Sequence, residues 1–130
     1  MSFRIIQLEI LEVFVKEDSK NISLSFNDAF IKKTMDDAEE KTLWKQNGSI
    51  ELKNINNKVG IFLSRFNIAS ISVSYDFYTY KNILILPFIK KGDIEVTFND
   101  DKEMKNIKCN EIEILLVDKP EYIKHIKKTE

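Results

Sequence analysis

Apolar and polar residues alternate with a period of two along much of this chain, and no other sequence feature restricts the fold as strongly. This alternation is typical of β-strands that bury one face and expose the other, as in antiparallel sheets. It is clearest in residues 22–26, 50–53, 70–77, 94–98 and 111–116. We therefore predict a mainly β fold, an antiparallel sandwich or rolled sheet of about seven to nine strands.

Two apolar segments are less regular. Residues 3–15 are rich in β-branched residues and predict one long strand, although Ile6, Ile10 and Val13 also fit one face of a helix. Residues 83–89 form a continuous apolar run, as expected of a central strand that is buried on both faces. Because proline cannot donate to a β-ladder, Pro87 predicts an edge or a bulge at the end of this run.

Local signals near the middle and the end of the chain predict turns and helices. Asn47-Gly48 is typical of a two-residue hairpin, but it would equally end a short helix over 37–46, and the sequence leaves both open. Pro120 suits the first position of a C-terminal helix. Tyr122, Ile123 and Ile126 would form its apolar stripe, and its late lysines would suit the helix dipole.

The length of 130 residues corresponds to a single domain spanning 1–130. Cys109 is the only cysteine, so it cannot form an internal disulfide, and we predict that it is a buried structural residue in a reducing, cytoplasmic setting. No membrane association is expected, because the uncharged stretch at 82–89 is far shorter than the roughly 20 residues of a membrane span. Abundant Lys, Ile and Asn indicate an AT-rich, bacterial source.

The sequence holds no recognisable catalytic or metal-binding motif. His125 is the only imidazole, and we place it on the surface of the predicted C-terminal helix. There is no histidine pair, no Cys-x-x-Cys spacing and no glycine-rich phosphate loop. We therefore predict a protein that is not an enzyme and that has no cofactor. A net charge of −1 opposes binding to the phosphates of nucleic acids.

Charge is distributed unevenly along the chain. Residues 92–121 contain nine acidic residues and four lysines, and acidic side chains take the outward positions of the predicted strands. We predict that they form an acidic stripe for a basic protein partner, because such fields steer association. A merely solvated face, neutralised by the basic segment 57–91, is the alternative. The predicted partner-binding residues are Glu95, Asp100, Asp101, Glu103, Glu111 and Glu113.

Residues 93–101, followed by 107–114, resemble a strand pair of small bacterial immunity proteins that protect against polymorphic toxins. The segment 25–29 is similar to an early Phe-His-Asp-Ala segment of the same proteins. The chain departs from that pattern at Asp101, where glycine is usual, and at Asn27, where histidine is usual. The resemblance implies a single-domain inhibitor that binds one secreted toxin, and it transfers no catalytic residue.

Three functional hypotheses follow. The first is a non-catalytic protein-binding module, an immunity-type inhibitor that occludes a basic toxin domain through the acidic stripe. The second is a structural protein, such as a phage or surface component, that self-associates through a sheet edge at 83–89. The third is a small-ligand binder or an enzyme whose site forms around Tyr78, Tyr80 and Trp44.

Overall fold

In this computed structural model, residues 3–34, 41–56, 64–100 and 102–126 are described, and every regular element within them is a β-strand. The strands are β1 (Arg4–Gln7), β2 (Leu11–Asp18), β3 (Asn21–Thr34), β4 (Lys41–Lys53), β5 (Arg65–Ile68), β6 (Ser70–Tyr75), β7 (Tyr78–Lys81), β8 (Ile83–Leu86), β9 (Ile89–Asn99) and β10 (Met104–Ile126). All their pairings are antiparallel. The prediction of a mainly β, antiparallel fold is confirmed.

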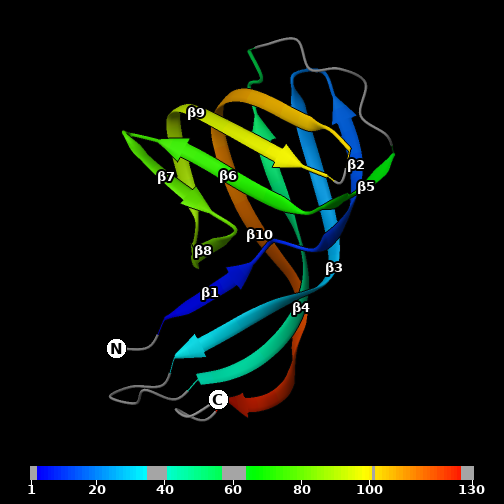
Figure 1. Ribbon diagram of the computed structural model, residues 1–130, viewed down its shortest axis with the longest axis vertical. Coiled ribbons are helices and arrows are strands. Elements are labelled where there is room, and N and C mark those ends of the chain that lie inside the picture. The colour runs from blue at the N-terminus through cyan, green and yellow to red at the C-terminus, as the bar shows by residue number, and fades with distance from the viewer. Residues whose placement is uncertain (1–2, 35–40, 57–63, 101, 127–130) are drawn as a thin grey trace.

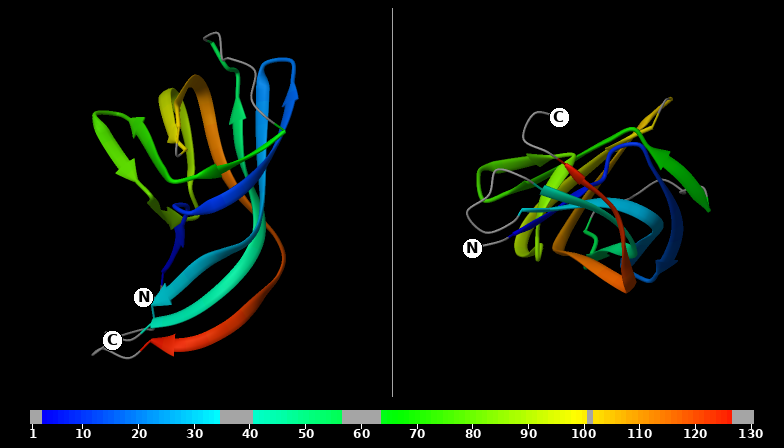
Figure 2. Two further views of the ribbon diagram at one scale, coloured as in Figure 1. Left: turned by 45° about the vertical axis from the view of Figure 1, so that its right-hand side comes forward. Right: turned by 90° about the horizontal axis from the view of Figure 1, so that it is seen from below.

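The strands form one sheet that curls on itself, which matches the rolled sheet of the two predicted alternatives (Figures 1 and 2). The main order is β5-β2-β3-β4-β10-β9-β6-β7, and β1 pairs with β3 on one side and with β8 on the other. Asn82 connects β6 to the segment that follows β1 through two backbone hydrogen bonds. Its backbone N–H donates to Ile71 O at 3.0 Å, and its carbonyl accepts from Leu8 N at 2.8 Å.

The inner face of the curled sheet carries the apolar half of the alternating pattern. Leu24, Ile50 and Ile114 lie opposite one another on β3, β4 and β10, and all three are buried. Phe98 of β9 is fully buried and meets Phe66 edge-on, with 6.0 Å between the ring centroids. The core is therefore built from side chains that alternate along strands far apart in the sequence.

The three longest strands, β3, β4 and β10, bend together and continue as a ribbon at the bottom of Figure 1. The bends in β3 and β10 occur at register shifts, where Asp28 and Asp118 adopt positive φ angles of 56° and 64°. Asn47 of β4 joins the two bends. Its Oδ1 accepts from Asp28 N at 2.9 Å, and its Nδ2 donates to Asp118 Oδ2 at 2.9 Å.

The structure corrects the interpretation of Asn47-Gly48, which is neither a hairpin turn nor the end of a helix. Both residues lie inside β4, so the helix over 37–46 is wrong for residues 41–46, and residues 37–40 lie outside the described part. Gly48 faces Phe26 across the β3–β4 pair. A Cβ at position 48 would collide with Leu115 O and lie 2.9 Å from Phe26 Cζ. Glycine is therefore required by packing, not by a turn.

The predicted C-terminal helix is also wrong, because β10 continues as a strand to Ile126. The spacing of its apolar residues suits a helix, but β4 supplies a pairing partner from elsewhere in the chain. Tyr122 lies opposite Trp44, and their rings meet edge-on at 5.2 Å. Pro120 lies in the register shift between Val117 and Glu121, where no ladder position requires its missing N–H.

The two less regular apolar segments also differ from expectation. Residues 3–15 form two strands instead of one, and the chain breaks between them at Ile10, whose φ is 55°. The run at 83–89 is interrupted after β8 by a cis peptide bond between Leu86 and Pro87. β8 is buried on one face only, because Ile83 and Ile85 are exposed.

Candidate protein-binding surface

The predicted acidic residues Glu95, Glu111 and Glu113 come from two strands that are hydrogen-bonded neighbours, β9 and β10. This confirms the adjacency on which the acidic stripe depends. Glu95 is exposed on β9 and lies opposite Lys108 of β10. Its Oε1 accepts a hydrogen bond from Asn106 Nδ2 at 2.9 Å, which fixes the direction of the carboxylate.

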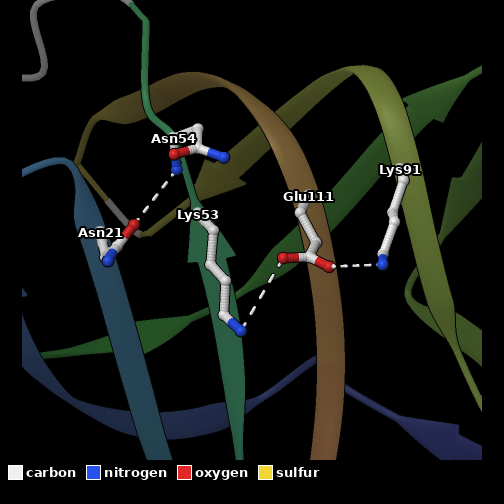
Figure 3. Close-up of polar contacts among 5 residues, drawn as sticks. All are labelled: Asn21, Lys53, Asn54, Lys91 and Glu111. Carbon is white, nitrogen blue, oxygen red and sulfur yellow. Dashed lines mark hydrogen bonds and ion pairs between the residues drawn. The ribbon is translucent and has the colours of Figure 1, made fainter.

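Glu111 is engaged within the protein. Lys53 of β4 approaches one of its carboxylate oxygens at 3.8 Å, and Lys91 of β9 approaches the other at 3.5 Å (Figure 3). In the same view, Asn21 Oδ1 accepts from Asn54 N at 3.2 Å and holds the ends of β3 and β4 together. The predicted stripe is therefore interrupted by a row of alternating charges that crosses three strands.

Glu113 has a different environment, because it lies directly opposite Glu51 of β4. Like charges that face each other across a strand pair are destabilising. Among the described residues, neither carboxylate has an ion-pair partner. This pair therefore offers a place for a cationic group from a partner molecule.

The remaining predicted acidic residues belong to the β9–β10 connection. The backbone N–H groups of Lys102 and Glu103 each donate to Asp100 Oδ1 at 2.7 Å, and these bonds hold the pKa of Asp100 below its ordinary value. Glu103 pairs with Lys105 at 3.1 Å. Asp100 and Glu103 thus help to form the connection itself, and Asp101 lies outside the described residues.

An open hollow of about 700 Å³ lies between the β6–β7 turn and strand β9. Its charged lining residues are Asp76, Asp93, Glu95, Lys91 and Lys108. The other lining residues are Asn56, Ser74, Tyr75, Phe77, Gly92, Ile94 and Cys109. Of the predicted partner-binding residues, Glu95 is the one that lines this hollow.

Sequence reasoning did not single out Asp76, Phe77 or Asp93 as binding residues. One signal for a turn at the first two residues was present in the sequence. Asp76-Phe77 separates an alternating segment that ends at Tyr75 from a second segment that begins at Tyr78. That arrangement is compatible with a two-residue hairpin, but the dipeptide lacks the glycine that normally marks one. Asp93 carried no such signal, because its position beside the hollow depends on β6 pairing with β9.

The aromatic residues proposed as a ligand site fall into two separate clusters. Tyr78 and Tyr80 have ring centroids 4.6 Å apart, and Tyr80 meets Phe88 at 5.1 Å. Lys90 Nζ lies 5.7 Å from the Tyr80 ring centroid, within cation–π range. Trp44 instead packs on Tyr122 in the bottom ribbon. The described contacts do not assemble one aromatic site from Trp44 and the two tyrosines.

Cys109, His125 and the acidic side chains are the described residues to consider as nucleophiles, bases or metal ligands. Cys109 is buried, as predicted, and burial raises the pKa of its thiol to about 11, which favours the unreactive protonated form. Within the described ranges, no three side chains of the His, Cys, Asp or Glu type form a group that could hold a metal ion. His125 lies on β10 and not on a helix. No helix of the described part is long and apolar enough to cross a membrane.

Comparison of the chain with known protein families, with curated protein sequences and with solved structures finds no match.

Proposed function

We propose that this chain is a non-catalytic protein-binding module, an immunity-type inhibitor that covers the active surface of a basic toxin domain. The supporting observation is the charge on the outward side of β4, β9 and β10 around Glu111 and the hollow, together with the β6–β7 turn, and we call this region the acidic face. It carries six carboxylates against three lysines, Lys53, Lys91 and Lys108. The carboxylates are Glu51, Asp76, Asp93, Glu95, Glu111 and Glu113.

The excess of negative charge gives this face a steering function. Complementary charge raises the rate at which a basic partner associates and selects against acidic partners. Two of the lysines are already paired with Glu111, so within this face the other five carboxylates outnumber the one further lysine, Lys108. In this proposal the chain acts in the reducing cytoplasm of a bacterium, a setting that suits its single buried thiol.

Charge reversal tests this proposal. Glu95→Lys combined with Glu113→Lys is expected to slow association with a basic partner at least about tenfold and to flatten its salt dependence. Glu111 is left unchanged, because its reversal would also disturb the row formed with Lys53 and Lys91. The measurement is a stopped-flow association rate at several salt concentrations, with the partner identified by affinity capture from source cells.

The matched control is Glu12→Lys with Glu17→Lys. Both residues are exposed on β2, which β3 and β4 separate from β10. This control carries the same change in net charge and should associate at nearly the wild-type rate. Equal slowing in both variants, or slowing in neither, would contradict a role for the acidic face.

Self-association is a second candidate, favoured by the exposed side chains of Ile83 and Ile85. Ile5 lies opposite Ile85, on the same side of the β1–β8 pair. Within the described strands β8 pairs with β1 alone, so its other edge is open, and the contact would use this edge together with the exposed isoleucine side chains. Affinity capture that returns only further copies of the chain would favour this candidate.

A further inference from the structure

The β6–β7 connection is a two-residue turn in which both residues have unusual backbone angles. Tyr75 and Tyr78 are the last paired residues, and between them Asp76 and Phe77 have φ angles of 50° and 64°. Turns of this kind favour glycine at the second position, because a side chain in the left-handed region is sterically strained. A bulky phenylalanine is therefore a costly choice at this position.

The fold does not use the Phe77 ring to offset this strain. The side chain is completely exposed, at 109% of its reference area, and it stands at the edge of the hollow beside Asp76, Asp93 and Glu95. Residues that are held in strained conformations without a structural benefit are concentrated at functional sites. Ile10 is also strained and exposed, but it does not line the hollow. The strain and exposure of Phe77 together with its position at the charged hollow thus indicate a role outside the folded chain.

The hairpin that carries Phe77 is held in place by its neighbours. The hydroxyls of Ser74 and Thr79 are hydrogen-bonded across the strand pair at 3.0 Å. Tyr75 packs closely over Gly92, where a Cβ would lie 3.3 Å from the Tyr75 ring. An aromatic side chain on a fixed backbone has only two side-chain torsions to restrict on binding, which is a property of strong interface anchors.

We propose that Phe77 is the hydrophobic anchor of the acidic face and inserts into an apolar socket, rimmed by basic groups, on a partner protein. This inference rests on the proposed function and adds the chemistry of the partner's surface. Anionic membranes and nucleic acids fit less well, because the three carboxylates beside the ring outnumber the two lysines of the hollow, of which Lys91 is paired with Glu111.

Three variants separate the effect of losing the Phe77 ring from the effect of relieving backbone strain. Phe77→Gly removes the ring and relieves the strain, so it should fold with a midpoint of thermal unfolding at or above that of the wild type. Phe77→Trp keeps an aromatic anchor. Ile10→Gly is the matched control, because Ile10 is also exposed, at 86%, has φ of 55°, and does not line the hollow.

The probe is a phage-displayed library of random peptides, selected for binding to the wild-type chain. The dominant binders are expected to carry Lys or Arg next to apolar residues, and to bind Phe77→Gly at least about tenfold more weakly than wild type. They should retain most of their affinity for Phe77→Trp and Ile10→Gly. Dominant binders with equal affinity for wild type and Phe77→Gly would overturn the anchor.

The same binders distinguish this inference from the function on which it rests. Dependence on Phe77 without any loss on Glu95→Lys would keep the anchor and contradict the acidic face as the steering surface. Loss of binding in Glu95→Lys with no dependence on Phe77 would support the acidic face as the steering surface and overturn Phe77 as the anchor. Wild-type self-association that disappears in Phe77→Gly would make a second copy the occupant and would overturn the basic partner.

Discussion

Replacing Gly48 with alanine is expected to destabilise the fold by about 3 kcal/mol, which is the upper part of the range for overpacked interiors. The added methyl group would collide with the backbone carbonyl of Leu115 and lie 2.9 Å from Phe26 Cζ. Urea unfolding followed by fluorescence measures the effect. Ser49→Ala, at the next position of β4 and partly exposed, is the control and should change stability by less than about 0.5 kcal/mol.

A second substitution identifies which contact causes the loss. Phe26→Leu removes the ring that faces Gly48 but leaves the Leu115 carbonyl in place. If the carbonyl dominates, Gly48→Ala remains strongly destabilising in the Phe26→Leu background. A fully tolerated alanine in the wild-type background would show that β4 does not pass between β3 and β10 as described.

Phe98→Ala is expected to destabilise the fold by about 4 kcal/mol, the middle of the range for large buried aromatic residues. Phe98 is fully buried on β9 and lies opposite Ile71 of β6, so its loss would leave a cavity at the centre of the curled sheet. Its edge-on contact with Phe66 adds a further contribution, which a double-mutant cycle isolates.

The control for Phe98 is Phe14→Ala on β2, where the side chain is exposed. The same chemical change at that position should cost less than about 1 kcal/mol. Both free energies come from the same urea titrations. A loss at Phe98 no larger than the loss at Phe14 would contradict the position of β9 in the core.

The alternation of apolar residues was sufficient to predict strands with the correct buried face at 22–26, 50–53, 94–98 and 111–116, because period two fixes which side chains share a face. It failed where a nonlocal partner determines the structure. Residues 122–126 satisfy helical spacing, yet they form a strand because β4 lies beside them. Asn47-Gly48 has the composition of a turn, yet both residues lie within a strand. Asn47 links the bends of β3 and β10 through its side chain, and Gly48 leaves room for Phe26 of β3 and the Leu115 carbonyl of β10.

The candidate site, too, was predictable from the sequence only in part. Outward acidic positions on β9 and β10 followed from the alternation, and the pairing of the two strands brings them together. The lysines that bind Glu111 were not predictable as its partners, because Lys53 and Lys91 come from strands on either side of β10. The alternation over 70–77 predicted that Phe77 belongs to a buried strand face, and that prediction is wrong, because Phe77 lies in a turn and is completely exposed.

The most direct test of the account is hydroxyl-radical footprinting of the chain, free and bound to its captured partner, with oxidation measured by mass spectrometry. We predict that partner binding strongly suppresses oxidation of Phe77 and Tyr78, while Phe14 and Ile10 react as in the free chain. Unchanged oxidation of Phe77, with protection concentrated at Ile83 and Ile85 instead, would contradict the acidic face and its anchor as the binding surface.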